Sequence, residues 1–470
     1  MSGTSGSSSG RASWSGQLAF VLAAAASAVG LGNLWRFPYL AAKYGGGVFI
    51  AVYLALSLTL GITLLVTEIA LGRYSRQSQL TAFNKLGYRR WHFLGVLATI
   101  VPLVILPYYN VISGWVVKYF LVYAKLAFTG GALAEPEQFF NAFISSPWEA
   151  FVCMVVLTVF VSGVIMLGVK NGIEKSNLFM MPILFFMAIG IAVYVSTLPG
   201  AGEGIRFYLV PDFSNCDNFG KVVLGAMGQM FYSLSLAMGI MITYGSYMRR
   251  SDSISSSCVR IVAADTFVAT VSGFMIIPVV VMFAAQSGGG RSAIDAGPGL
   301  MFITLPKVFA SLGAAGSWVG FVFFTLVLFA ALTSSISMAE TCVASVCDFF
   351  HVKRKTSTLM VTIWSILLGS VSAFGYGRWS SFKPCGMPAL EFFDFSMNSI
   401  LMPIVAALTC VFVGWVLTPK RILAECRREG GDLGFKVFYI AMIKYFAPML
   451  VLAILVSEVC RFFGIGGWNI

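Results

Sequence analysis

The residues most able to do chemistry lie in the first apolar stretch of the chain, in the run Ser27 to Pro38 (SAVGLGNLWRFP). Two glycines, Asn33, Arg36 and a proline interrupt a segment that would otherwise suit a membrane helix. A helix that breaks inside a bilayer frees backbone N–H and C=O groups, and lipid cannot hydrogen-bond them. These groups must face protein, water or an ion. The interruption therefore predicts a binding site built largely from backbone groups.

The composition places this site in a membrane. The 470 residues are 58% hydrophobic and only 11% charged, with a mean hydropathy of +0.86. A soluble protein of this length could not bury so much apolar surface, so we expect an all-α polytopic membrane protein. The nine cysteines and two histidines show no CxxC or other metal-ligand spacing, which argues against a disulfide framework or a structural metal site. No hydrolase or protease motif is present, so we do not expect an enzyme.

Apolar stretches of spanning length occur eleven times. They fall near residues 17–43, 47–72, 92–124, 150–168, 176–197, 221–247, 258–285, 318–349, 357–375, 391–418 and 435–463. The Ser/Gly-rich residues 1–16 predict a mobile cytoplasmic tail rather than a cleavable signal peptide.

The net charge of +12 indicates how the chain is oriented in the membrane and does not indicate nucleic-acid binding. With the N-terminus inside, most basic residues fall in the inside loops, and the acidic residues gather in the outside loops with only a few basic ones. We therefore expect a multi-pass protein of the inner (plasma) membrane with a cytoplasmic N-terminus. The odd number of spans then puts the C-terminus outside.

The sixth span repeats the design of the first. Helix-like sequence over Lys221–Tyr232 meets a small, polar run, Ser233–Gly239, and resumes at Ile240. Two interrupted spans that lie five apart indicate a five-plus-five inverted repeat with the site between the breaks. We expect one transporter domain, in which residues 17–197 (spans 1–5) and 221–418 (spans 6–10) are the repeats and 435–463 is an added eleventh span.

At these residues the chain resembles the neurotransmitter:sodium symporter family, in its bacterial amino-acid (LeuT-type) branch. The resemblance runs from about residue 11 to 460. The motifs that carry it are 28–38, Gly45–Gly47, Glu68 with 71–74, 229–239, Thr333–Ser335 and 391–394. It implies a LeuT-type fold with discontinuous spans 1 and 6.

The resemblance implies two sodium sites. One would use Ala28, Asn33, Ser233 and the substrate carboxylate, with Asp265 at a position where many relatives have asparagine. The second would use Ala26, Val29, Ala330, Thr333 and Ser334.

Each of these assignments has an ordinary structural alternative. Serine and threonine in membrane helices commonly hydrogen-bond to their own helix or to a neighbour. An aspartate at mid-bilayer could instead be protonated, since its ionised form costs about 2.5–3.5 kcal/mol there. A sodium ion beside Asp265 would remove that cost.

Chloride-dependent relatives hold the anion with hydroxyls and amides near this place. Tyr53, Gln229 and Ser233 match that pattern, but Ala269 stands where the seventh-span serine would be. Asp265 could supply the negative charge instead. We therefore expect transport without chloride.

The resemblance also implies an amino-acid substrate. Monoamine carriers have an aspartate at position 30 in place of the carboxylate that their substrates lack, whereas this chain has Gly30. The implied substrate site comprises Ser27, Ala28, Gly30, Leu31, Gly32, Ile105, Tyr109, Tyr232, Ser233, Ser235, Met238, Ser334 and Met338. It contains no charged side chain and two adaptable methionines, which favours neutral, hydrophobic or aromatic amino acids.

The family's two gates also have counterparts. Arg36 and Asp394 match the extracellular pair, while Arg11, Trp14, Ser246, Tyr247 and Asp348 match the intracellular set. The sequence assigns no role to Glu340 or Glu458.

The favoured interpretation is a sodium-coupled symporter that works by alternating access. A monomer would suffice, an oligomer is compatible, and the partners are the amino acid and the lipid bilayer. A proton-coupled carrier of the same architecture, using Asp265, is the main alternative. A channel or ligand sensor would keep the site but lose the coupling.

Overall fold

The computed structural model describes residues 12–146, 148–216, 218–286, 298–428 and 434–464. Every regular element within these ranges is a helix, and the β-type pairing within them is a single isolated bridge between Gly46 and Pro211. The prediction of an all-α protein is confirmed. Arg11 of the predicted intracellular gate lies outside the described residues.

Nine helices within the described ranges are long and apolar enough to cross a membrane. They are Gly47–Ser75, Arg89–Thr129, Glu149–Met166, Val169–Ser196, Ile254–Met282, Ala315–Phe350, Arg354–Phe374, Ala389–Leu417 and Lys436–Phe463. They coincide with predicted spans 2 to 5 and 7 to 11. The two spans that the sequence predicts to be broken are the two absent from this set.

The first of the broken spans is a bent pair. Helix α1 (Gln17–Ala28) is followed by a π-helical turn, η1 (Gly32–Arg36), and by α2 (Phe37–Lys43), with a bend of 53° between the two parts. The sixth span consists of α11 (Phe219–Ser233) and α12 (Ile240–Ser246), which are 15 and 7 residues long. At 1.5 Å per residue, neither piece crosses a 30 Å hydrocarbon layer alone.

Several long helices contain π-helical segments that the sequence does not predict. The unbroken spans are built from α3 (Gly47–Leu56), η2 (Ser57–Gly61), α4 (Ile62–Ser75), α6 (His92–Thr129), α8 (Glu149–Met166), η4 (Val169–Glu174), α9 (Lys175–Ser196), α13 (Ile254–Gln286), α15 (Ala314–Phe350), α16 (Arg354–Phe374), α17 (Ala389–Asp394), η9 (Phe395–Leu401), α18 (Met402–Val411), η10 (Phe412–Leu417), α20 (Lys436–Ala441), η12 (Met442–Phe446) and α21 (Ala447–Phe463). Such segments often mark functional sites or bends.

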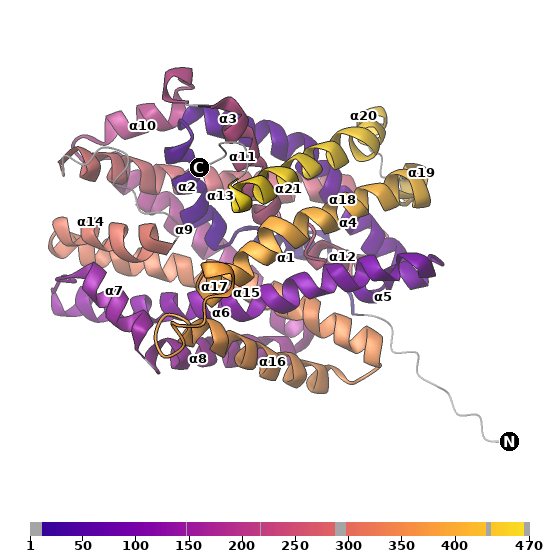
Figure 1. Cartoon of the computed structure of the whole chain (residues 1–470), viewed down its shortest axis with the longest axis horizontal. Helices are drawn as coiled ribbons and strands as arrows, with labels where there is room; N and C mark the ends of the chain where they lie inside the picture. Colours follow the sequence, from indigo (N-terminus) through magenta and orange to yellow (C-terminus); the bar gives the residue numbers. More distant parts are fainter. Residues whose placement is uncertain (1–11, 147, 217, 287–297, 429–433, 465–470) are drawn as a thin grey trace.

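Short helices lie at the two ends of the bundle (Figure 1). Helices α7 (Pro136–Ser145), α10 (Ala201–Leu209) and α14 (Leu305–Ser311) lie at the left end of the view, and α5 (Gln79–Lys85) and α19 (Pro419–Arg427) lie at the right end. The long helices run between these ends, so the broken helices are enclosed by the bundle.

Small residues let the helices around the breaks approach closely. A Cβ atom on Gly72 of α4 would lie 1.9 Å from the Ile242 carbonyl oxygen, and one on Gly245 of α12 would lie 2.4 Å from that of Ile69. Only glycine fits at these two crossing points, as is common where membrane helices pack tightly. The contact fixes α12 against α4 and thereby positions the break between α11 and α12.

Candidate functional site

The break after α1 leaves backbone groups that side chains capture. Val29 has ψ of 95°, so the helix ends there. The Gly30 N–H donates to Oδ1 of Asn33 at 3.2 Å, and the Leu31 N–H donates to the Tyr109 hydroxyl oxygen at 3.4 Å. The freed groups therefore face a polar interior, as the sequence predicts.

The break between α11 and α12 is wound differently. Ser235, Ala237 and Gly239 all have positive φ, at 53°, 61° and 70°. Two of them are not glycine, and a strained residue of this kind costs about 1–3 kcal/mol. The Ala237 N–H donates to Oε1 of Glu68 at 2.7 Å, and the Ser235 hydroxyl donates to the Ser27 carbonyl at 3.0 Å. The two breaks are thus joined to each other and to α4.

A cavity of about 360 Å³ lies between the two breaks. Its walls are Ser27, Ala28, Gly30, Leu31, Gly32, Asn33, Ile105, Tyr109, Tyr232, Ser233, Ser235, Met238, Ile240, Ser334 and Met338. The structure therefore brings all thirteen residues of the implied substrate site to one cavity, together with two that the sequence does not assign to it, Asn33 and Ile240. No charged side chain is among these walls.

The cavity has both polar and apolar walls. Backbone groups of the α1 break and the Tyr109 hydroxyl are polar, while Ile105, Met238 and Met338 supply apolar surface. An apolar cavity with a few fixed polar groups suits a small molecule that has both polar and apolar parts.

Asp265 lies beside this cavity with its carboxylate fully buried. Oδ1 accepts from Asn33 Nδ2 at 2.8 Å and from the Ser233 hydroxyl at 2.7 Å, and Oδ2 accepts from the Tyr53 hydroxyl at 2.8 Å. Asp265 forms no ion pair with any arginine or lysine in the described part of the chain. Asn33, Ser233 and Asp265, three side chains implied for the first sodium site, are thus in direct contact.

The residues implied for the second sodium site are also buried, on α1 and α15. The Thr333 hydroxyl donates to the carbonyls of Phe329 and Ala330, both at 3.0 Å, and the Ser334 hydroxyl donates to the Ser27 carbonyl at 3.3 Å. These are the ordinary helix contacts of such residues. Donating the hydroxyl proton leaves the oxygen lone pairs free, so the same side chains can still ligate a cation.

The two residues of the predicted extracellular gate do not form a direct ion pair. Arg36 lies over the ring of Tyr232, with 5.3 Å between the guanidinium carbon and the ring centre. Asp394 accepts from the Tyr108 hydroxyl at 3.0 Å and from Asn398 at 2.6 Å. Each charge of the predicted gate pair therefore has other partners in the described structure.

Part of the intracellular set lies at the beginning of α1. Trp14 is fully buried. Its indole N–H donates to the Tyr244 carbonyl at 3.1 Å, and its backbone N–H donates to the Tyr247 carbonyl at 3.2 Å. Asp348 accepts from the Ser78 N–H at 2.7 Å, and the Ser246 hydroxyl donates to the Thr243 carbonyl at 2.5 Å. The described members of this set therefore lie at one end of the bundle.

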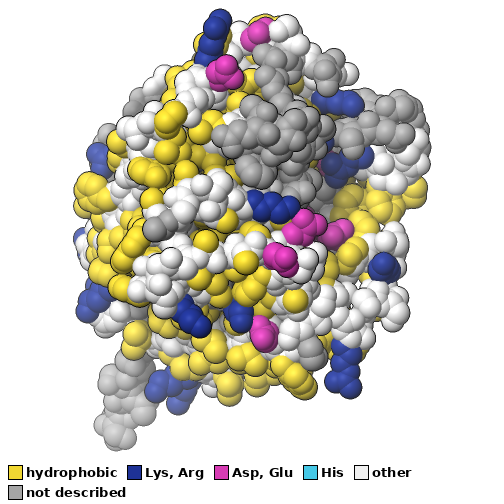
Figure 2. Space-filling model, turned by 90° about the vertical axis from the view of Figure 1, so that its left-hand side faces the viewer, with side chains coloured by type: hydrophobic (Ala, Val, Ile, Leu, Met, Phe, Trp, Pro, Cys, Tyr) yellow, Lys and Arg dark blue, Asp and Glu magenta, His cyan; other side chains and the backbone are white. Residues whose placement is uncertain are grey.

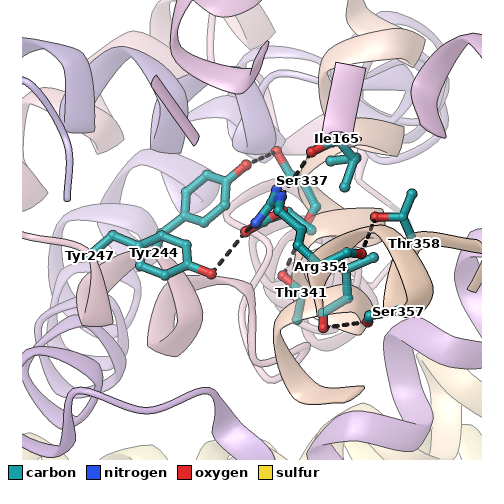
Figure 3. Close-up of polar contacts among 10 residues, drawn as sticks. Ile165, Tyr244, Tyr247, Ser337, Thr341, Arg354, Ser357 and Thr358 are labelled. Carbon is teal, nitrogen blue, oxygen red and sulfur yellow. Dashed lines mark hydrogen bonds and ion pairs between the residues drawn. The ribbon is translucent and has the colours of Figure 1, made fainter. Parts of the chain in front are cut away.

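Tyr247 leads to a polar cluster that the sequence does not predict (Figure 3). Its hydroxyl donates to Oε1 of Glu340 at 2.8 Å. Arg354 forms a two-point ion pair with Glu340 and donates to the Ile165 carbonyl at 2.9 Å. The cluster joins α8, α12, α15 and α16. The one available sequence signal is the unexplained Glu340 inside an apolar span, since such a charge needs a partner.

Replacing Arg354 by alanine should destabilise the protein. Glu340 is fully buried, and removing its cation leaves an uncompensated charge, which costs about 3–5 kcal/mol at a buried pair. We expect a clear fall in the thermal unfolding temperature of the purified protein. Lys353→Ala, which removes an exposed neighbouring charge, is the control. Equal unfolding temperatures for the two variants would contradict this interpretation.

Comparisons with known proteins agree with this arrangement. The profile of the sodium:neurotransmitter symporter family matches residues 11–131 and 137–466. The chain is 32% identical over 447 residues to an uncharacterized sodium-dependent transporter, YhdH, of Bacillus subtilis, covering 94% of this chain and 97% of that protein. It is 27% identical to the human sodium- and chloride-dependent GABA transporter 2, covering 87% of this chain and 74% of that protein.

A solved structure is similar over almost the whole length. The crystal structure of MhsT in complex with L-phenylalanine has a TM-score of 0.85 and 34% sequence identity to this chain. The match covers 96% of this chain and all of that one.

Proposed function

The chain belongs to the sodium:neurotransmitter symporter family, and from that membership we propose that it is a sodium-coupled symporter that imports neutral, hydrophobic or aromatic amino acids by alternating access. The predicted LeuT-type fold is confirmed by the similarity to MhsT. The observation that carries the proposal is Asp265: a buried carboxylate with three hydrogen-bond donors and no cationic side chain beside it in the described structure.

The arrangement around Asp265 favours a cation as the missing partner. Three donors point at its two oxygens, which suits an ionised acceptor better than a protonated acid. A charge at this depth is costly unless something neutralises it. Sodium prefers hard oxygen ligands, and the Ala28 carbonyl, Asn33 and Ser233 offer them beside Asp265. The second ion would be held by the carbonyls of α1 and by Thr333 and Ser334.

The substrate would place its carboxylate at the α1 break. The N–H groups of Leu31 and Gly32 and the Tyr109 hydroxyl lie there, at a helix N-terminus that favours an anion. Gly30 leaves room for a carboxylate that the substrate itself brings. The apolar walls, without a charged side chain, suit a neutral side chain. The complex of MhsT with L-phenylalanine supports the same class of substrate.

We propose that chloride is not required. Tyr53 and Ser233, which match the anion-binding pattern of the chloride-dependent relatives, donate their hydroxyls to Asp265. Their donors are already used by a fixed negative charge. The chloride dependence in the name of GABA transporter 2 applies to that relative.

Transport would use the membrane potential. Each sodium ion that moves inward across 100 mV contributes about 2.3 kcal/mol, so two ions can drive strong accumulation. Arg36, Tyr232 and Asp394 would close the outer side, and Trp14, Tyr247 and Asp348 the inner side. One monomer contains the whole cavity and the residues proposed for both sodium sites, so a monomer would suffice.

The proposed setting is the inner (plasma) membrane, with a cytoplasmic N-terminus and an external C-terminus. Figure 2 views the end of the molecule that carries α7, α10 and α14, where side chains of both charges are scattered among uncharged ones. Lys307 pairs with Glu137 at 2.7 Å there, and this ammonium group lowers the pKa of Glu137 below its ordinary value. Mixed charge on the short loops suits the outer side.

Uptake into proteoliposomes tests the proposal. The twenty amino acids would compete against labelled phenylalanine under an inward sodium gradient, and again with potassium in place of sodium. We expect neutral, apolar amino acids to compete only with sodium present. Uptake that follows a pH gradient and ignores sodium would instead support the proton-coupled alternative, and flux far above carrier rates would support a channel.

Two single substitutions locate the ions. Asn33→Ala and Thr333→Ala each remove an oxygen ligand, and we expect the sodium concentration for half-maximal substrate binding to rise about tenfold, equivalent to about 1.4 kcal/mol. Thr325→Ala is the matched control, because Thr325 makes the same contact to its own helix two turns earlier on α15. An unaltered sodium response in both variants would refute the assignments.

A further inference from the structure

Helix α6, which carries Tyr108 and Tyr109, contains Pro107 in its interior. Proline has no backbone N–H, so Pro107 leaves the carbonyl of Leu103, one turn earlier, without its helical donor. Within the hydrocarbon layer lipid cannot supply a replacement. The turn over residues 103–107, here called the proline turn, therefore needs a hydrogen-bond donor from another helix.

That donor comes from α16, which lies beside α6 and α8 (Figure 1). The indole N–H of Trp364 donates to the Leu103 carbonyl at 2.9 Å. Trp364 is the eleventh of the 21 residues of α16, and 45% of it is exposed. Tryptophan is enriched at the membrane interfaces, where its polar tip can reach water. An indole at the middle of a span needs an acceptor from the protein, and the proline turn provides it.

Two further contacts fix α16 against the proline turn. Asn110 Nδ2 donates to the hydroxyl of Ser365, the residue after Trp364, at 3.2 Å. A Cβ atom on Gly369 would lie 3.1 Å from the Pro107 carbonyl oxygen, so the two helices also pack closely here. Adjacent residues of α16 thus hold α6 four residues before Pro107 and three residues after it.

The residues that follow the proline turn are the ones that the proposed site uses. The Tyr109 hydroxyl oxygen accepts from the Leu31 N–H at 3.4 Å, and the Tyr108 hydroxyl donates to Asp394 at 3.0 Å. Tyr109 is the second residue after Pro107. Because its hydroxyl is at the far end of the side chain, a small rotation of α6 at the turn displaces the hydroxyl more than the backbone.

We propose that Trp364 is a positioning residue for substrate binding: by donating to the Leu103 carbonyl, it fixes the proline turn and thereby the place of the Tyr109 hydroxyl at the α1 break. This inference rests on the proposed function, in which that hydroxyl meets the carboxylate of the substrate. Trp364 is not among the residues that line the cavity, so it acts through α6.

Substrate binding in saturating sodium tests the route through Tyr109. Trp364→Phe removes the indole N–H and keeps an aromatic ring. We expect the dissociation constant of labelled phenylalanine to rise about threefold, the usual size of the effect for a hydrogen bond between membrane helices. The double variant Trp364→Phe/Tyr109→Phe should bind no more weakly than Tyr109→Phe alone, because the hydroxyl that Trp364 positions is then absent. Additive losses would overturn the inference. Trp318→Phe on α15, where 47% of the tryptophan is exposed, is the matched control and should leave binding unchanged.

Substitution of the proline tests the route through the Leu103 carbonyl. Pro107→Ala restores a backbone N–H that can donate to this carbonyl, so the indole is no longer needed there. We expect Trp364→Phe to weaken phenylalanine binding about threefold in the parent and not at all when it is added to Pro107→Ala. Equal losses in the two backgrounds would overturn the inference.

Hydrogen exchange without substrate separates this inference from the proposed function. Because the Leu31 N–H donates to Tyr109, Trp364→Phe should speed exchange in residues 29–34 about threefold. Exchange in α21 should stay unchanged, which excludes a general loss of stability. Unchanged exchange in residues 29–34 would overturn the inference even in a protein that binds no amino acid. A parent protein that shows the exchange response but binds no phenylalanine would support the positioning of Tyr109 and refute the proposed function.

Discussion

Replacing Asp265 by asparagine is expected to raise steeply the sodium concentration that substrate binding and uptake require. The amide cannot neutralise a cation, and its NH₂ group would meet the donors of Asn33, Ser233 and Tyr53, which now point at the carboxylate. Loss of a charged partner at a buried site costs about 3–5 kcal/mol, so the sodium requirement should rise at least about a hundredfold. Sodium titration of labelled amino-acid binding measures the change.

Two comparisons make this result specific. Tyr53→Phe removes one of the three donors and keeps the charge, so its effect should be much smaller. The parent protein should take up its substrate equally well when chloride is replaced by gluconate. An unchanged sodium requirement in Asp265→Asn would refute the first sodium site, and uptake that collapses in gluconate would refute chloride independence.

Replacing Gly30 by aspartate should remove binding of amino acids, by about a hundredfold or more. A Cβ atom at this position would lie 2.6 Å from the Ser334 hydroxyl oxygen and 3.3 Å from that of Tyr109. The added carboxylate would also occupy the place proposed for the substrate's own carboxylate and repel it. In the parent, phenylalanine and its decarboxylated analogue, phenethylamine, would compete against a labelled amino acid. In the variant, binding of the same two compounds would be measured directly.

Gly30→Ala separates crowding from charge. The Ser334 hydroxyl is at the end of a short side chain that can rotate, so the methyl group of Gly30→Ala should lower substrate affinity less than the carboxylate does. Adding the second substitution Ser334→Gly should relieve the crowding by this methyl group. If Gly30→Asp binds phenylalanine as tightly as Gly30→Ala does, the carboxylate subsite is placed wrongly.

The sequence predicts the broken helices well because their signals are local. In the first span the signal is a set of glycines with Asn33, and in the sixth it is the small, polar run after Tyr232. Each signal lies within a single apolar stretch whose length is known. Once both breaks are placed, the residues around them must share one cavity. Ile240 escapes this prediction because it is the first residue of α12, whose start depends on how the break is wound.

Contacts between helices are harder to predict. Glu340 and Arg354 are separated by a helix end and a turn, and Arg354 looks like one more basic residue of an inside loop. Arg36 and Asp394 have opposite charges at suitable depths, but the Tyr232 ring and the Tyr108 hydroxyl decide their partners. The π-helical segments have no sequence pattern that distinguishes them from α-helix, so the sequence does not predict η4.

The left-handed residues between α11 and α12 also limit how such a cavity can diversify. A β-branched side chain cannot adopt the φ values of Ser235 and Ala237 without severe strain, so few amino acids are tolerated there. Drift among relatives should therefore leave this wall almost constant in shape. New preferences for larger or smaller cargo would have to arise on the regular helices opposite, at Ile105 of α6 and Met338 of α15.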